Sequence, residues 1–262
     1  SQPMKVLLIG DSCEDRYFYG DAKRLSPEAP VPILQYKRGV TTEGMAWNVY
    51  NNLKVFGVDV YMLTNEEKII KTRFIDEKSN QQILRSDEEP EITPLPHKQP
   101  FIDDRSAYHK LHHKVPLQDW YDIMVISDYD KGYITHEKLF ELVEWFEGPV
   151  IIDSKKTNLP DKCYIKVNDL EYEKLETKTN NVIITKGGVG AEYQGKLYPA
   201  EKVNVFDVVG AGDTFLAALT YGYLKHGSIE EAIPIANKAA AVAVSHRGTY
   251  VLTQEDVKKI LY

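Results

Sequence analysis

The residues with the clearest capacity for chemistry lie in Asp207–Phe215, where an aspartate follows two glycines at the start of a helical run. Gly210 and Gly212 let backbone N–H groups turn inward at a helix N-terminus, where the first amides have no partner within the helix. Such a turn favours anions, and phosphate in particular. Asp213 lies among these donors and could take a proton from a hydroxyl that attacks a phosphoryl group. An aspartate that only caps the helix would give the same local pattern.

Polar residues and glycines also follow the predicted strands elsewhere in the chain. Ligands of open α/β sheets gather at the carboxyl ends of the strands, so we expect these segments to lie near one another. They are Gly10-Asp11 after Val6–Ile9, Ser127-Asp128 after Ile123–Ile126, Asn168-x-x-Glu171 after Tyr164–Val167, and Thr185-x-Gly187-x-x-Gly190 after Val182–Ile184.

Short apolar strands alternate with helical runs along most of the chain, which is typical of an α/β fold with a doubly wound, mostly parallel sheet. Helical spacing predicts helices over 44–56, 136–146, 214–225 and 229–245. No linker interrupts the pattern. We therefore predict one domain over residues 1–262.

Two segments, 16–38 and 69–85, have sequence patterns typical of strands, and we expect these strands to lie outside the main sheet. Prolines exclude a helix from the first segment, and the second alternates as a hairpin that turns at 76–80. Residues 64–68 are too few for a helical crossover, so the hairpin should follow the preceding strand directly. We predict a small β-flap over the site, although an ordinary surface excursion would have a similar composition. Its strand edges favour a homodimer through the flap.

Composition restricts the class of protein. The formal net charge of −7 argues against a general nucleic-acid binder, and no apolar run is long enough to span a bilayer. Cys13 and Cys163 form neither a disulfide framework nor a CxxC motif. We expect a cytoplasmic protein without a signal peptide after Met4, acting on small molecules and not at a membrane.

One alternative chemistry starts from Gly10-Asp11-Ser12, which is similar to the nucleophile block of the GDS-type esterases. In those enzymes the serine attacks an acyl group and requires a late Asp-x-x-His. The chain has Asp256-x-x-Lys259 at that place. The sequence therefore favours phosphoryl transfer over ester hydrolysis.

Taken together, the motifs resemble those of the ribokinase-like (PfkB) sugar kinases. The resemblance rests on Gly210-Ala211-Gly212-Asp213, Asn168-x-x-Glu171 and Thr185-x-Gly187-x-x-Gly190 in the expected order. A narrower resemblance is to the D-glycero-D-manno-heptose 7-phosphate kinases, which form the kinase half of bifunctional ADP-heptose synthases. That resemblance covers nearly the whole chain and rests on Gly10-Asp11, Asp15-Arg16-Tyr17, residues 26–32 and Ser127-Asp128-Tyr129-x-Lys131-Gly132.

The resemblance implies a role for each motif in an ATP- and Mg²⁺-dependent kinase. Asp213 would be the catalytic base beside an anion hole formed by the amides of Gly210, Ala211 and Gly212. The residues bordering ATP would be Thr185, Gly187, Gly190 and Asn237. Asn168 and Glu171 would organise Mg²⁺ and the phosphates as indirect metal ligands.

The same resemblance implies an acceptor pocket lined by Asp11, Gly44, Asn48 and Asp128. Lys131, or one of the flap cations Lys71, Arg73 and Arg85, would hold the phosphate of the substrate. A solvated face is the alternative for those cations.

Several positions depart from the family. Gly44-Met45-Ala46-Trp47-Asn48 stands where the family has Gly-Gly-Ala-Ala-Asn, so bulky side chains occupy positions that normally admit the sugar. Residues 64–68 omit a helix and a strand, and Val209 replaces a common threonine. The nucleotidyltransferase half of the bifunctional enzymes has no counterpart in this sequence.

The resemblance thus implies transfer of the γ-phosphoryl group of ATP to the anomeric hydroxyl of heptose 7-phosphate, a step toward ADP-heptose and lipopolysaccharide. Two alternatives stay open because of the altered pocket. The chain could phosphorylate another sugar or a nucleoside, or it could be a catalytically impaired relative that binds nucleotide or acts as a scaffold.

Overall fold

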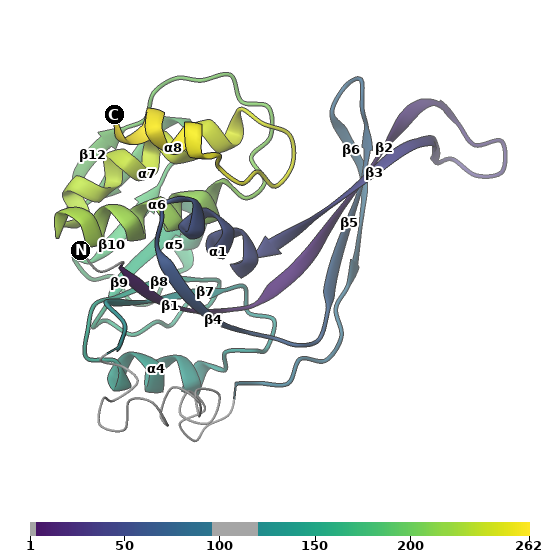
Figure 1. The fold of residues 1–262 in the computed structure, drawn as a ribbon. Helices are drawn as coiled ribbons and strands as arrows, with labels where there is room; N and C mark the ends of the chain where they lie inside the picture. The colour runs from purple at the N-terminus through teal and green to yellow at the C-terminus, as the bar shows by residue number, and fades with distance from the viewer. Residues whose placement is uncertain (1–3, 96–119) are drawn as a thin grey trace.

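Two β-sheets of different size make up the fold, and helices pack on the larger one (Figure 1). The computed structural model describes residues 4–95 and 120–262. Within these residues the larger sheet has eight strands, in the order β12 (Lys196–Pro199), β11 (Gly190–Tyr193), β10 (Val182–Thr185), β9 (Tyr164–Asn168), β8 (Val150–Ser154), β7 (Ile123–Asp128), β1 (Lys5–Gly10) and β4 (Asp59–Thr64).

The strands from β10 to β4 pair in parallel, and β11 and β12 extend the sheet as antiparallel edge strands. Strand β1, which lies between β7 and the edge strand β4, reads Lys-Val-Leu-Leu-Ile-Gly, and its residues from Val6 to Ile9 are fully buried. Such an unbroken apolar run is expected of a parallel strand that is covered on both faces. The predicted α/β fold with a mostly parallel sheet is confirmed.

Helices cover both faces of this sheet, which gives two apolar cores. One face packs against α1 (Ala46–Val55), α6 (Ala211–His226), α7 (Ile229–Val244) and α8 (Gln254–Leu261), and its core includes Val6 and Leu8. The other face packs against α4 (His136–Trp145), and its core includes Leu7 and Ile9. The alternation along β1 thus distributes its side chains between the two layers. No helix within 4–95 or 120–262 is long and apolar enough to cross a membrane.

The smaller sheet projects from the body as a flap (Figure 1). Its order is β3 (Pro32–Met45), β2 (Ser12–Leu25), β5 (Ile69–Asp76) and β6 (Gln81–Glu88). Both segments are longer than the predicted 16–38 and 69–85, because pairing continues from Arg16 back to Ser12 opposite Met45 and from Arg85 on to Glu88 opposite Ile70. As the short junction predicts, β4 leads directly into β5.

The two faces of the flap differ. Tyr17, Tyr19 and Ile75 form a small buried cluster within it. Tyr36 and Leu84, by contrast, are 60% and 57% exposed. The flap therefore carries apolar side chains that the described part of this chain does not cover.

Candidate active site

The turn before α6 is held in place by hydrogen bonds from its own first residues. Asp207 accepts the amide of Val209 through one carboxylate oxygen and the amide of Gly248 through the other, both at 3.0 Å. Gly210 then begins α6 with φ of +78°, and a Cβ added to it would lie 2.7 Å from Nδ2 of Asn48. Both the backbone conformation and the crowding require glycine there. The amide of Ala211 donates to the carbonyl of Val208 at 3.3 Å, which tightens the turn.

Asp213 lies in the first turn of α6 and is only 4% exposed. Its Oδ1 accepts the hydroxyl of Tyr129 at 2.7 Å, and its Oδ2 accepts Nδ2 of Asn48 at 3.4 Å. Burial raises the pKa of Asp213 to about 7, with Asp153 adding to the rise while Tyr129, Lys166 and Asn48 oppose it. A carboxylate with a pKa near neutrality is suited to accept a proton from a substrate hydroxyl.

A buried lysine supports the same turn from β9. Nζ of Lys166 lies 3.1 Å from Oδ2 of Asp153 and donates to the carbonyl of Gly212 at 3.3 Å. Lys166 itself is only 4% exposed. Its positive charge lies behind the turn and offsets part of the cost of burying Asp213 and Asp153.

The turn separates two cavities. The α7 cavity has a volume of about 410 Å³, and Val208, Ala211 and Gly212 form part of its wall. The flap cavity has a volume of about 250 Å³ and is lined from the same turn by Val209, Gly210 and Asp213. One short stretch of backbone thus contributes to the walls of two cavities, with Asp213 on the side of the flap.

The α7 cavity brings together the predicted ATP-bordering residues Thr185, Gly187, Gly190 and Asn237. Its other walls are largely apolar, because Phe215, Ala240 and Val244 line it as well. Asn237 donates through Nδ2 to the carbonyl of Tyr198 at 3.0 Å. A concave, mostly apolar site with a few polar groups beside a helix N-terminus suits a nucleotide.

Asn168 and Glu171 lie apart from the walls of the α7 cavity. They form a capping box at the start of the short helix α5 (Asp169–Lys174), in which Oδ1 of Asn168 accepts the amide of Glu171 and Oε1 of Glu171 accepts the amide of Asn168. The second carboxylate oxygen of Glu171 accepts Nζ of Lys155. Since the side-chain oxygens of this pair are all engaged, the pair does not fit a direct metal site.

The rest of the described chain does not offer a direct metal site either. Within residues 4–95 and 120–262, no group of three or more His, Cys, Asp or Glu side chains is arranged to hold an ion. It therefore remains a prediction that Asn168 and Glu171 act on Mg²⁺ indirectly. Their position is nonetheless close to the nucleotide motif, since Asn168 pairs with Thr185 across β9 and β10.

None of the predicted acceptor residues Asp11, Gly44, Asn48, Asp128 and Lys131 is among the residues that line the flap cavity. Asp11 and Asp128 are buried behind it and hold backbone and side chains of neighbouring loops. Asn48 bonds Asp213, as above, and Lys131 forms an ion pair with Glu89. The structure places these residues where they support the cavity, so their direct contact with a substrate remains a prediction.

Gly44 shows how this support works. A Cβ on Gly44 would lie 2.2 Å from Oδ2 of Asp15 and 2.8 Å from Sγ of Cys13. Any side chain at residue 44 would displace these two residues, which both line the flap cavity. Gly44 therefore acts on the cavity through the space it leaves for Asp15.

Four residues that line the flap cavity were not predicted as site residues: Cys13, Asp15, Tyr129 and Thr249. Asp15 forms a buried ion pair with Arg73 at 2.9 Å and accepts the hydroxyl of Thr249 at 3.0 Å. The signal for Asp15 was present, since it belongs to Asp15-Arg16-Tyr17 and shares a strand face with Cys13. Thr249 had no such signal, because it comes from a loop far away in sequence.

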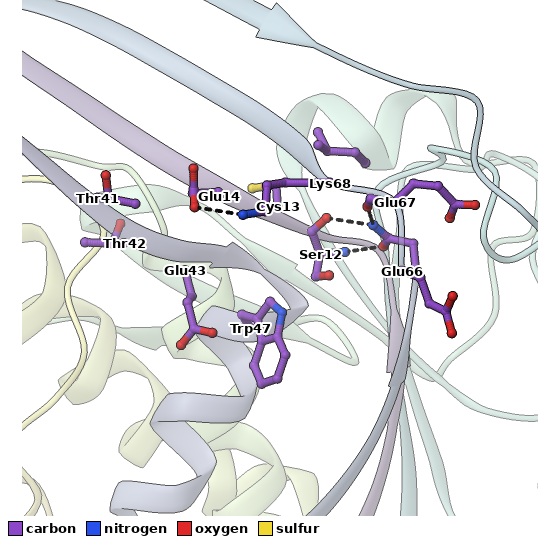
Figure 2. A pocket seen from close by; sticks show the side chains of 12 residues that line it. Ser12, Cys13, Glu14, Thr41, Thr42, Glu43, Trp47, Glu66, Glu67 and Lys68 are labelled. Atoms are coloured by element: carbon purple, nitrogen blue, oxygen red, sulfur yellow. Dashed lines mark hydrogen bonds and ion pairs between the residues drawn. The ribbon is translucent and has the colours of Figure 1, made fainter. Parts of the chain in front are cut away.

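Met45 and Trp47 are separated by the fold. Met45 lines the flap cavity and has φ of +55°, an unfavourable backbone conformation for a residue with a side chain. Trp47 lines a different cavity of about 270 Å³ at the root of the flap, together with Ser12, Glu43 and Lys68 (Figure 2). Of the two bulky residues, only Met45 thus narrows the cavity beside Asp213.

Cations gather on the flap side of that cavity, where Lys71, Arg73 and Arg85 line it. Arg73 forms an ion pair with Asp15, and Arg85 forms one with Asp87, each at 2.9 Å. Lys71 forms no ion pair with any residue in the described part of the chain. Burial lowers the pKa of Lys71, and the nearby positive charges of Lys131 and Arg85 lower it further. Such a group of cations would gain from an anionic partner.

Comparison with known proteins connects this geometry to one group of enzymes. Residues 168–256 match the family described as pfkB family carbohydrate kinase. Curated relatives include the bifunctional protein HldE of Nitratiruptor, 29% identical over 308 residues with 97% of this chain and 64% of the relative covered. HldE of Helicobacter pylori is 30% identical over 316 residues, with 98% of this chain and 66% of the relative covered.

The chain thus spans 64% of the length of the Nitratiruptor relative. Solved structures with a similar fold include the ribokinase of Thermotoga maritima, with a TM-score of 0.69, 18% identity and coverage of 98% and 99% of the two chains. The ribokinase of Arabidopsis thaliana complexed with ribose and ATP has a TM-score of 0.67 at 18% identity, with 99% of each chain covered. At this level of identity the two structures show the shared fold alone.

Proposed function

We propose that this chain, which belongs to the pfkB family of carbohydrate kinases, phosphorylates a hydroxyl group of a sugar phosphate with ATP as the donor. Its class is that of the phosphotransferases with an alcohol group as acceptor. Within this class, the acceptor we favour is D-glycero-D-manno-heptose 7-phosphate, phosphorylated at its anomeric hydroxyl. The sequence motifs and the HldE relatives both support that choice.

The observation that carries the proposal is the turn shared by the two cavities. Ala211 and Gly212 face the α7 cavity, where ATP would place its phosphates at the N-terminus of α6. Asp213 faces the flap cavity, where the acceptor would lie. A phosphoryl group could thus pass from one cavity to the other across a single helix start, which aligns donor and acceptor as this chemistry requires.

In this arrangement Asp213 accepts the proton of the acceptor hydroxyl. As it does so, the hydroxyl oxygen of the acceptor bonds to the γ-phosphorus. The bond between the γ-phosphorus and the β–γ bridging oxygen breaks, which releases ADP. The amides of Gly210 and Gly212 and the nearby charge of Lys166 would favour the negative charge on the transferred group, whereas the amide of Ala211 already donates to the carbonyl of Val208. Bound ATP supplies the phosphoryl group, and Mg²⁺ carried on its phosphates would neutralise their charge. Asn168 and Glu171 would influence that ion only through water or through the phosphates.

The flap cations support a phosphorylated acceptor. Lys71 and Arg85 line the same cavity as Asp213, and Lys131 is close enough to affect the charge of Lys71. A phosphate at the end of the sugar opposite the reacting hydroxyl would pair with them. Lys71, which has no carboxylate partner among the described residues, would then anchor that phosphate.

The test uses a panel of acceptors with ATP and Mg²⁺: heptose 7-phosphate, the same heptose without phosphate, fructose 6-phosphate, ribose and adenosine. We expect heptose 7-phosphate to have the highest kcat/KM and to yield a bisphosphate. Turnover of a different acceptor alone would refute the heptose assignment and keep the kinase. ATP binding without turnover of any acceptor would refute the kinase activity and favour a binding or scaffolding role.

A pair of lysine variants tests the anchor. Lys71→Met should raise the KM for a phosphorylated acceptor at least about tenfold and leave the KM for its unphosphorylated form nearly unchanged. The reason is that the variant removes a cation that would bind only the phosphate of the acceptor. Lys68→Met is the matched control, since Lys68 lies close to Lys71 in sequence but lines the separate cavity beside Trp47 at the root of the flap (Figure 2). Equal effects of both variants would contradict the anchoring role.

We also propose that two copies of the chain associate through the flap, in the cytoplasm where ATP and sugar phosphates are available. Exposed apolar side chains on the flap support this proposal: Leu25 at 67%, Tyr36 at 60% and Leu84 at 57% exposed. A sheet with free edges and uncovered apolar residues gains stability when a second copy covers it.

A further inference from the structure

We propose that Tyr129 is a positioning residue of the reaction, whose hydroxyl keeps the Asp213 carboxylate ionised and directs its free oxygen toward the acceptor. The proposal rests on the proposed function, in which Asp213 is the base. It adds a residue that stands in the loop after β7, outside the glycine, Asn-x-x-Glu and Thr-x-Gly motifs.

The structure fixes Tyr129 at both ends. Its backbone amide donates to Oδ2 of the fully buried Asp11 at 2.7 Å, and its hydroxyl donates to Oδ1 of Asp213 at 2.7 Å. The ring itself lines the flap cavity, and Nζ of Lys155 lies 5.5 Å from its centre. Tyr129 therefore connects the residue after β1 to the first turn of α6 through one hydrogen bond at each end.

The two oxygens of Asp213 are engaged unequally. Oδ1 has the short bond from Tyr129, whereas Oδ2 has only the long contact of 3.4 Å from Asn48. A long contact of this kind is weak and easily replaced. Oδ2 is thus the oxygen that an acceptor hydroxyl can approach, while Tyr129 prevents the carboxylate from rotating.

Charged and titratable groups reach Asp213 from several elements. Asp153 at the end of β8 disfavours its charge, and Lys166 on β9 favours it. Lys155, after β8, and Cys13 on β2 are close enough to interact with Asp213 electrostatically. Among these groups, the hydrogen bond from Tyr129 favours the ionised form of Asp213 most strongly. Burial opposes that form most strongly.

Tyr129 remains a donor over the relevant pH range. Burial raises the pKa of its hydroxyl well above the ordinary value, and the charge of Asp213 raises it further. The hydroxyl therefore stays protonated wherever the kinase would work. Loss of this donor should consequently raise the pKa of Asp213, since a hydrogen bond to the charged form favours that form.

The test is Tyr129→Phe, which keeps the ring and removes the hydroxyl. A hydrogen bond to a charged group is large enough to move the acid limb of kcat/KM upward by about one pH unit. With Asp213 starting near 7, that shift should lower the rate at pH 7 about fivefold and leave the rate at pH 9 nearly unchanged. A uniform loss at all pH values, an effect on the acceptor KM alone, or an unchanged profile would overturn the proposal.

Tyr250→Phe is the matched control, because the hydroxyl of Tyr250 donates to Asp256 at 2.6 Å outside both cavities. It should leave the pH profile in place. A second readout needs no turnover: the ¹³C carboxyl resonance of Asp213, identified by its absence in Asp213→Asn, titrates in both proteins. A higher pKa in Tyr129→Phe supports the proposal even if no acceptor is phosphorylated, which would remove only the proposed function, and an equal pKa overturns it.

Discussion

Replacement of Asp213 by asparagine should make the protein more stable and much less active. Asparagine keeps the size of the side chain but cannot ionise or accept a proton. Turnover should fall at least about 100-fold, since general-base catalysis contributes factors of this order. ATP affinity should change little, because Asp213 faces the flap cavity and not the α7 cavity.

The gain in stability follows from the pKa of Asp213. Burial raises it from 3.8 to about 7, so the folded protein binds this proton more tightly than the unfolded chain does. The ionised carboxylate therefore destabilises the fold above pH 7, by about 4 kcal/mol for a shift of about three units. The new amide of asparagine would oppose Nδ2 of Asn48, at a cost of about 1 kcal/mol. The net gain should be about 2–3 kcal/mol at pH 8.

Urea unfolding and calorimetry at two pH values measure this gain. At pH 8 the midpoint temperature of Asp213→Asn should exceed that of the unmodified protein by about 4–8 °C. At pH 4.5 most of the difference should vanish, because Asp213 is then neutral in the folded protein, as asparagine is, and only the remaining ionisation of the unfolded chain favours the variant. An asparagine variant that is no more stable at pH 8, or equally stabilised at both pH values, would refute the reasoning.

Three further substitutions test the site and the flap. Gly210→Ala should destabilise the fold by about 2 kcal/mol and lower turnover at least about tenfold, because the residue has φ of +78° and no room for a Cβ. Gly57→Ala, with φ of +82° and open space around it, is its control in the same unfolding and rate assays. Met45→Gly should lower the KM of bulkier sugar phosphates at least about threefold by widening the flap cavity, as acceptor kinetics would show, and an unchanged KM would contradict its narrowing role. Leu84→Asp should shift a flap dimer toward monomer in sedimentation velocity, whereas Leu170→Asp, an exposed leucine outside the flap, should not.

Much of the fold could be predicted because local patterns determine it. The apolar runs of β1, β7 and β10 each end in polar residues, and their parallel pairing needs no information beyond this alternation. The nucleotide side was predictable for a similar reason. Thr185, Gly187 and Gly190 form a turn within one short segment, so their sequence spacing already determines their spatial arrangement.

The acceptor side could be predicted only in part, because it depends on the register of the flap. The sequence predicted Asp11 as an acceptor ligand, whereas the start of β2 at Ser12 places Asp15 at the cavity and leaves Asp11 outside its walls. The Asn168 and Glu171 pair shows a second limit. A capping box and a nucleotide motif require the same residue types at the same spacing, so sequence alone cannot distinguish them.

The way in which the flap joins the body has a mechanical consequence. The parallel neighbours β1 and β4 of the main sheet continue directly into β2 and β5, which are also parallel neighbours. Where the two pairs meet, the side chain of Asn65 accepts the amide of Ser12 at 2.8 Å and donates to its carbonyl at 3.2 Å. The flap is also joined to the body where β3 continues into α1, so it does not depend on these two strands alone. Any displacement of the flap would thus act on β1 and β4 of the main sheet and would carry Lys71 and Arg73 on β5 with it.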